Sequence, residues 1–168
     1  MADDEQNATM ALDGLEDSRR AWLDLLDGMR RTLLLYTPLV RSELYNDADL
    51  LAAIRQRVVN QPKLRFQLLL PPARGWRGDC PGLVRLSERL TTSLILRTPN
   101  RDETPDRPEL GQAFAIVDER LLLRFSDPLR LIGAYETRSS ERLKELLELF
   151  RRLWDRAHPD PDLQRLGI

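Results

Sequence analysis

Three residue types are scarce in this chain, and each scarcity excludes a kind of chemistry. Cys80 is the only cysteine among 168 residues, which excludes an internal disulfide or an all-cysteine metal site and favours a reducing compartment. His158 is the only histidine, so no mechanism can draw two histidines from one chain. Lysine occurs only as Lys63 and Lys144, and all the other basic residues are arginines.

The chain also lacks a long apolar run and a net charge of either sign. No run reaches the ~18 residues of a membrane span, and the acidic opening at Asp3, Asp4 and Glu5 differs from a secretory signal. The formal net charge of −1 creates no global field toward nucleic acid or anionic lipid. With 42% hydrophobic and 32% charged residues, the chain is long enough for one soluble domain, which we expect to be cytoplasmic.

Three short apolar runs, each closed by proline, predict strands that are buried on both faces. The runs cover residues 32–37, 64–70 and 94–97 and lack the alternation of a half-exposed strand. Apolar residues at helical spacing precede each run: Trp22, Leu25, Leu26 and Met29, then Leu50, Leu51, Ile54 and Val58, then Leu83, Leu86 and Leu90. The resulting βαβαβ order, with right-handed crossovers, predicts three parallel strands in one sheet.

The second half of the sequence predicts a hairpin and a long helix. Residues 112–117 and 121–125 are short β runs around a tight turn, and residues 131–135 suggest a further edge strand. A helical stripe then begins near Ser139 or Ser140 and continues to Ala157. We therefore expect an α/β fold: a three-layer αβα sandwich with a mostly parallel sheet, then a β-hairpin and a long C-terminal helix.

The same patterns predict one domain between two tails. Residues 1–14 are acidic and without periodicity, which favours a flexible N-terminal tail. Residues 15–158 hold all the expected elements and form the α/β domain. Prolines end the last helix, so residues 159–168 are expected to be a C-terminal tail.

This order of elements resembles one half of the phospholipase D-like superfamily. Residues 33–38 and 64–70 look like that family's first two core strands, and residues 112–118 look like the strand that carries its H-x-K signature and following aspartate. With Asp118 as that aspartate, the histidine position falls on Gly111 and the lysine position on Ala113. The family's G-S-x-N stretch falls on residues 125–128, where only Ser126 is retained.

These departures from the family's signature predict an inactive protein. The resemblance implies a histidine that attacks phosphorus and a lysine that holds the phosphate oxygens, and neither Gly111 nor Ala113 can fill these roles. His158 lies beyond the final helix, away from the signature strand. The chain is also similar to a group of bacterial domains with the Leu-Tyr-Thr-Pro-Leu pattern of residues 35–39 and the Trp-Asp-Arg pattern of residues 154–156, some of which follow a GNAT-type acetyltransferase domain.

Arginines follow the expected strands where an open parallel sheet binds its ligands, beyond the carboxyl ends. The candidate anion site consists of Arg41, Arg74, Trp76, Arg77 and Arg97. Guanidinium groups beside an aromatic ring can hold a phosphate or a single nucleic-acid strand. The alternative is that these are solvated loop residues of an arginine-rich chain.

Three functions remain open at this stage. The first is a non-catalytic phospholipase D-like module with a weak anion or phosphate site, and the second is a structural or regulatory protein-interaction domain with an exposed apolar patch. The third, a phosphodiesterase or nuclease completed in a homodimer, is disfavoured because two copies still lack a strand histidine. We expect no cofactor and no metal, and we expect an anionic ligand, another protein or a second copy as partner.

The sequence also suggests structural roles for Asp118 and Cys80. Asp118 is expected to cap its own hairpin turn, since aspartate commonly bonds to backbone amides within a turn. Cys80 precedes a predicted helix, where the helix terminus would lower its pKa somewhat, but no base follows nearby. A small half-buried residue is the preferred interpretation of Cys80.

Overall fold

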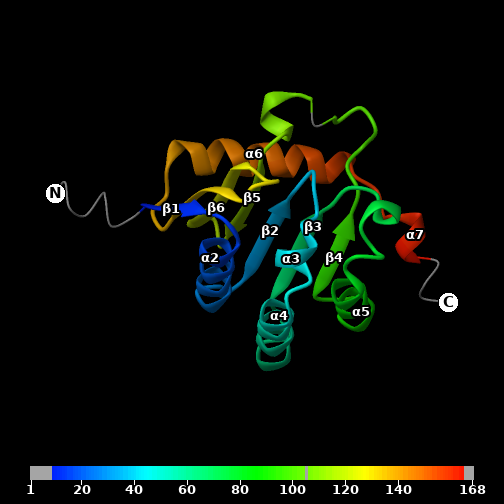
Figure 1. The fold of residues 1–168 in the computed structure, drawn as a ribbon. Coiled ribbons are helices and arrows are strands. Elements are labelled where there is room, and N and C mark those ends of the chain that lie inside the picture. Colours follow the sequence, from blue (N-terminus) through cyan, green and yellow to red (C-terminus); the bar gives the residue numbers. More distant parts are fainter. Residues whose placement is uncertain (1–8, 105, 165–168) are drawn as a thin grey trace.

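The computed structural model describes residues 9–104 and 106–164. In this part of the chain, a seven-stranded sheet has the order β1-β7-β6-β5-β2-β3-β4 (Figure 1). The strands are β1 (Thr9–Asp13), β2 (Thr32–Tyr36), β3 (Arg65–Leu69), β4 (Leu94–Arg97), β5 (Ala113–Val117), β6 (Leu121–Asp127) and β7 (Ile132–Glu136).

Helices cover both faces of this sheet, so the expected α/β class and the three-layer arrangement are confirmed. One layer contains α2 (Leu15–Asp27), α3 (Ser42–Tyr45), α4 (Ala48–Asn60) and α5 (Pro81–Arg89). The other contains α6 (Glu141–Arg156), which runs along the opposite face (Figure 1). The short helix α7 (Pro161–Gln164) and the 3₁₀ turns η1 (Ala73–Gly75) and η2 (Pro108–Leu110) lie in connecting segments.

The sheet is mixed, and the expectation of a mostly parallel sheet is wrong. β2, β3 and β4 are parallel neighbours, as predicted from the βαβαβ order. The pairings β2–β5, β5–β6, β6–β7 and β1–β7 are all antiparallel. The helical crossovers fix only the parallel part, whereas hairpin connections build the rest.

Both expected tails contain ordered elements, which corrects the domain boundaries in part. Thr9–Asp13 is the edge strand β1 and pairs with β7, and residues 1–8 lie outside the described residues. Only Leu12 of this strand is buried, so its sequence lacks the apolar pattern that would have revealed a strand. At the other end, Asp160 is buried and α7 follows it, while residues 165–168 lie outside the described residues.

Burial on both faces explains why the central strands are apolar throughout. Every residue of β5 is buried, because α2 covers one of its faces and α6 the other. α6 contributes Leu143, Leu146, Leu147, Phe150 and Leu153 to its side of the sheet, as its stripe predicted. Trp154, by contrast, is only half-buried and stacks on Phe150 with 5.8 Å between ring centroids.

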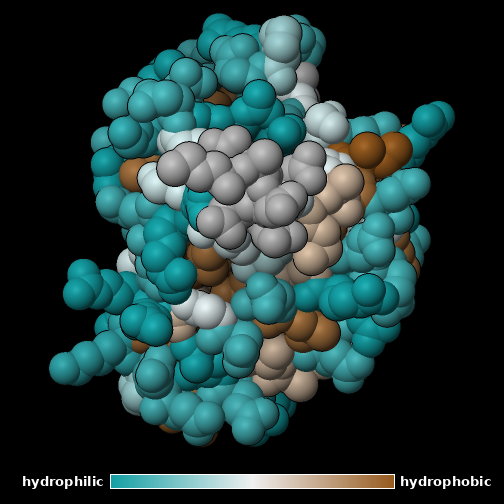
Figure 2. Space-filling model, turned by 90° about the vertical axis from the view of Figure 1, so that its left-hand side faces the viewer, coloured by the Kyte–Doolittle hydropathy of each residue, from teal (hydrophilic) through white to brown (hydrophobic). Residues whose placement is uncertain are grey.

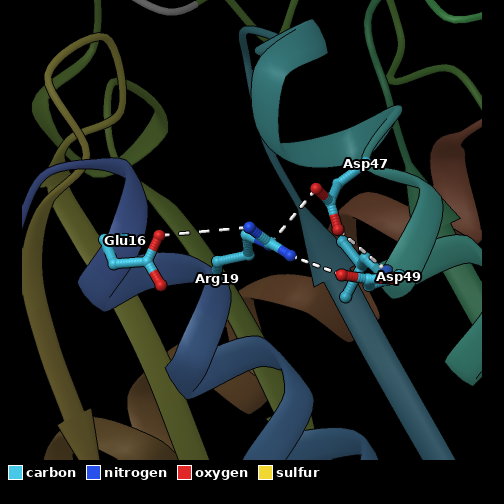
Figure 3. Close-up of polar contacts among 5 residues, drawn as sticks. Glu16, Arg19, Asp47 and Asp49 are labelled. Carbon is cyan, nitrogen blue, oxygen red and sulfur yellow. Dashed lines mark hydrogen bonds and ion pairs between the residues drawn. The ribbon is translucent and has the colours of Figure 1, made fainter.

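A charge cluster centred on Arg19 joins α2 to the beginning of α4 (Figure 3). The Arg19 Nη2 atom donates to Asp49 Oδ2 at 2.5 Å, and Nε lies 3.2 Å from Asp47 Oδ1 as a charge contact without hydrogen-bond alignment. Asp47 also caps α4 by accepting from the Leu50 amide. Glu16 lies farther away, at 4.0 Å. The cluster therefore fixes the spacing of two helices on the same face.

Asp118 binds a neighbouring segment rather than its own turn, which corrects the sequence expectation. It lies in the β5–β6 turn with a positive φ of 53°. Its carboxylate accepts hydrogen bonds from the amides of Arg30, Arg31 and Thr32 at 2.7–2.9 Å. We call this end of the sheet, where β2, β3 and β4 begin, the amino edge, and the end where they finish the carboxyl edge. Asp118 thus closes the amino edge.

Candidate functional site

A pocket of about 470 Å³ lies at the carboxyl edge. The segments that follow β2, β3 and β4 form its walls, together with the chain after α6. Tyr36 and several prolines supply apolar surface, and the polar and charged lining consists of Thr37, Arg74, Thr98, Asn100, Arg101, Glu103, Thr104, His158, Asp160 and Asp162. The pocket therefore lies where an open α/β sheet binds its ligands.

Tyr36 occupies the part of the pocket closest to the signature positions. Its hydroxyl donates to the Leu110 carbonyl at 2.6 Å, and its ring packs against Phe114 at 5.6 Å. Burial raises the pKa of Tyr36 far above its usual value, and the nearby Glu103 carboxylate raises it further. Ala113 is 1% exposed at the adjacent start of β5. This corner is thus filled by a neutral phenol that cannot serve as a ready nucleophile.

Asp160 attaches the C-terminal segment to the ends of β3 and β4. It is only 5% exposed, and its Oδ2 accepts from the Ala73 amide at 2.6 Å and from the Thr98 hydroxyl at 3.3 Å. Its Oδ1 accepts from the Asp162 amide at 2.9 Å. A backbone bridge between Thr98 and His158 adds a second connection. The carboxylate of Asp160 is therefore fully engaged in holding the pocket wall.

Glu103 is the second buried carboxylate at the pocket. Its side chain is 3% exposed, and Oε1 accepts from Arg156 Nη1 at 3.0 Å. Oε2 lies 3.6 Å from Arg107 Nη1 but has no hydrogen-bond donor among the described residues. Two arginines therefore balance its charge, while Oε2 is buried without a hydrogen-bond donor among the described residues.

The cations at the pocket are more exposed than the carboxylates. The Arg74 side chain is 82% exposed and lies 3.7 Å from Asp162. Arg101 is exposed and forms no ion pair with a described residue. His158 also lines the pocket, although its place in the sequence suggested a position away from the signature strand; its Nδ1 lies 3.2 Å from the Pro159 carbonyl.

The predicted cluster of five residues does not form one site, because only Arg74 lines the pocket. Arg41 pairs with Glu43 at 3.1 Å. Trp76 is 4% exposed in the core and donates from Nε1 to the Pro71 carbonyl. Arg77 is exposed in the segment before α5. Arg97 lies 4.4 Å from the Trp154 ring and donates to the Trp154 carbonyl.

The residues that replace this cluster gave only weak signals in the sequence. Arg101 and Glu103 belong to a charged loop that is typical of solvated surface, and Asp160 lies between two prolines after a helix. A carboxylate between prolines is the one feature that could have indicated a buried anchor.

Cys80 takes no part in the site. It is fully buried rather than half-buried, and burial raises its pKa to about 11, with Asp79 adding to the shift. The expected lowering of its pKa by the helix terminus is therefore wrong.

A family model described as "Domain of unknown function (DUF7931)" matches residues 14–166. The chain belongs to this family. No curated protein matches it in sequence.

Two solved structures share the fold at 13% sequence identity. One is TrmBL2, titled as an archaeal chromatin protein with a novel mode of DNA binding, with a TM-score of 0.58 over 90% of this chain and 54% of that one. The other is phosphatidylserine synthase from Haemophilus influenzae Rd KW20, with a TM-score of 0.53 over 94% of this chain and 43% of that one. The chain thus spans about half the length of these structures, and the likeness shows the fold alone.

None of the described helices has the length and apolar character needed to cross a bilayer. No three histidine, cysteine or carboxylate side chains in the described ranges are grouped so that they could hold a metal ion.

Proposed function

We propose that this chain is a non-catalytic, phospholipase D-like domain that binds a small phosphate-bearing ligand in the carboxyl-edge pocket. The observation that carries the proposal is the contrast between available cations and engaged carboxylates. Arg101 and the largely exposed Arg74, which lies 3.7 Å from Asp162, present cations at the pocket. Asp160 accepts three hydrogen bonds from the protein, and the charge of Glu103 is balanced by two arginines. A phosphate oxygen entering the pocket meets donors suited to bidentate hydrogen bonding.

The fold comparisons are in keeping with a ligand of this class. Of the two neighbours, one is named a phosphatidylserine synthase and the other is titled as a DNA-binding protein, and both names involve phosphate-bearing molecules. At 13% identity they support the fold alone, and the ligand position at the carboxyl edge rests on the general behaviour of open α/β sheets.

The residues at the pocket favour binding without phosphodiester hydrolysis. Gly111 and Ala113 hold the signature positions, and neither Lys63 nor Lys144 lines the pocket. His158 does line it, but its Nδ1 faces the adjacent Pro159 carbonyl and has no carboxylate partner among the described residues. A histidine without an orienting acid and without a neighbouring lysine lacks the arrangement that activates a nucleophile.

Calorimetric titration with ethyl phosphate tests the binding, and release of p-nitrophenol from bis-p-nitrophenyl phosphate tests the inactivity. We expect weak binding that decreases with salt, and no turnover. Arg101→Glu should abolish binding, whereas the matched reversal Arg142→Glu, in the first turn of α6, should leave it intact. Absent binding at low salt, or turnover that His158→Ala removes, would overturn the proposal.

A second candidate function, a protein-interaction domain, is favoured by exposed apolar side chains near β1. Met10, Leu129 and Ile132 are 55%, 60% and 38% exposed. Met10 pairs in register with Tyr135 and Ile132 with Asp13, so Met10 and Ile132 lie on opposite faces of this edge of the sheet. Figure 2 shows brown and tan residues among hydrophilic ones on the side that carries this edge. Self-association measured by sedimentation, and weakened by Ile132→Lys, would support this role. A monomer at every concentration would contradict self-association through these side chains.

A further inference from the structure

We infer that the ligand of the carboxyl-edge pocket carries an uncharged apolar group on its phosphate, and that this group packs against a wall of prolines. The inference rests on the proposed phosphate site and narrows its ligand class. The ligand would be a phosphate ester of an aromatic or aliphatic alcohol, rather than inorganic phosphate or an ester with a second charged end.

The proline wall is the first observation behind this inference. Of the sixteen residues that line the pocket, five are prolines: Pro38, Pro71, Pro72, Pro99 and Pro161. Pro72 and Pro161 are exposed and the other three are half-buried, so these rings present carbon surface that a ligand can reach. We call these five residues the proline wall.

A single carboxylate brings three members of the proline wall together. Asp160 Oδ2 accepts from the amide that directly follows Pro72 and from the hydroxyl of the residue directly before Pro99. Pro161 is the next residue after Asp160. The three rings therefore come from three segments of the chain that are held at one point.

The proline wall has little capacity to form hydrogen bonds with a ligand. Proline has no backbone N–H. The carbonyls of Pro71 and Pro72 already accept from the Trp76 indole at 2.7 Å and from the Gly75 amide at 3.1 Å. A charged group placed against this wall would lose its hydration without replacement, whereas an apolar group gains from leaving water.

Cations lie beside the proline wall, so one ligand can contact both. Arg74 and Arg101 each follow a wall residue, Pro72 or Pro99, by two positions and line the same pocket. The Asp162 side chain, 23% exposed, lies 3.7 Å from Arg74 and offsets part of its charge, so Arg101 is the main phosphate partner. A volume of about 470 Å³ is within the usual range of small-molecule sites and accommodates a phosphate with a six-carbon group.

Calorimetric titration with methyl, butyl and phenyl phosphate tests the inference, because the three esters share the phosphate and differ in apolar surface. Phenyl or butyl phosphate should bind about tenfold more tightly than methyl phosphate, which corresponds to about 60 Å² of additional buried apolar area. A gain for the phenyl ester alone indicates an aromatic alcohol, a gain for the butyl ester alone an aliphatic one, and either supports the inference.

Replacing two exposed members of the proline wall assigns this gain to the wall. The double variant Pro72→Ser/Pro161→Ser should reduce the advantage over methyl phosphate to under about threefold and leave methyl phosphate affinity unchanged. Pro62→Ser is the matched control, since Pro62 is exposed in the turn before β3 at the amino edge and does not line the pocket. An advantage that this control lowers equally would overturn the inference.

If the double variant does not fold, the wild-type protein supplies a second test. The heat-capacity change of binding should be more negative for the favoured ester than for methyl phosphate, because it reports buried apolar surface. Added salt should weaken both esters while their ratio stays constant, since screening acts on the shared phosphate. Equal heat-capacity changes would overturn the inference.

A fourth ester, 2-aminoethyl phosphate, tests the alternative that Asp162 accepts from a cationic group of the ligand. If this ester binds more tightly than phenyl and butyl phosphate, the second end of the ligand is charged and the inference is wrong. If methyl, butyl and phenyl phosphate bind equally, the proline wall takes no part while the phosphate site stands. If no ester binds, the phosphate site itself is wrong.

Discussion

Asp118 at the amino edge and Asp160 at the carboxyl edge both bind backbone amides of another segment, but they come from different parts of the fold. Asp118 accepts from three consecutive backbone amides, residues 30–32, and comes from a turn within the sheet. Asp160 accepts from two backbone amides and a hydroxyl, but it comes from the segment after α6. The amino edge is thus closed by elements that are already paired, whereas the carboxyl edge depends on a distant segment and leaves a pocket beside it.

This difference indicates at which end of the sheet a ligand could bind. Residues 28–32 and 118–120 do not line the carboxyl-edge pocket, and Arg57 and Arg120 donate to the Met29 and Gly28 carbonyls that follow α2. At the carboxyl edge, the corresponding loops surround open volume and expose Arg74 and Arg101. The predictions below test this contrast between a closed edge and an open one.

The largest stability loss should follow Asp160→Ala, at about 3 kcal/mol. Removing this buried carboxylate leaves the Ala73 amide without a partner and releases α7 from the strand ends. Denaturant unfolding measures the change. Asp162→Ala, which removes a more exposed carboxylate of the same segment, should cost less than about 1 kcal/mol. Equal losses for the two variants would mean that Asp160 does not anchor the segment.

Asp118→Ala should cost about 1–2 kcal/mol, less than Asp160→Ala. The three amides that it releases lie in a loop that is largely exposed, so water can replace the carboxylate. Because this loop lies at the opposite end of the strands from the carboxyl-edge pocket, ethyl phosphate affinity should not change. An affinity change comparable to that of Arg101→Glu would show that the two edges are coupled.

Arg97→Met should cost about 1 kcal/mol and leave phosphate affinity unaltered. The guanidinium of Arg97 lies over the Trp154 ring, donates to the Trp154 carbonyl and does not line the pocket, so its loss removes a cation–π contact and one hydrogen bond. Unfolding and titration of the same variant check both statements. Weaker binding at unchanged stability would place Arg97 in the site after all.

The buried tyrosines should have the smallest effect at neutral pH, because their raised pKa values influence the free energy of unfolding only in alkaline solution. Burial raises the pKa of Tyr36, Tyr45 and Tyr135, so the folded protein retains protons that the unfolded chain loses above the ordinary pKa of ~10. The contribution of the tyrosines to stability should therefore be constant below that pH and decrease as the pH rises beyond it, in addition to the loss from the Cys80 thiol, whose pKa is also raised by burial. Tyr36→Phe should make the fall less steep, and an unchanged slope would contradict the burial of Tyr36.

The sequence predicted the parallel half of the sheet better than the antiparallel half. β2, β3 and β4 were recognisable from their apolar runs, but the prediction that all three are buried on both faces is wrong for β4, an edge strand in which only Leu94 is buried. β1 escaped detection because its short stretch has no alternating pattern and buries only Leu12, and its strand conformation depends on pairing with β7. Long-range pairing of this kind cannot be read from local propensity.

The sequence indicated where the candidate site lies but not which residues line it. The carboxyl edge follows from the parallel strands, and Arg74 does line the pocket there. Trp76 and Arg97 have partners in the core and on α6, which are tertiary contacts that no spacing reveals. His158 and Asp160 reach the pocket because the chain turns back after α6, a path held by the buried Asp160 carboxylate and the Thr98–His158 backbone bridge.

One measurement tests the central claim, binding without hydrolysis, most directly. Phosphorus NMR of methyl phenyl phosphate, a phosphodiester with an uncharged apolar ring, can follow both events in one titration with the protein. We predict that its resonance broadens or shifts saturably in wild-type protein, that Arg101→Glu abolishes this change, and that no phosphomonoester signal develops. An unaffected resonance at low salt, or a monoester signal that disappears in His158→Ala, would contradict the account.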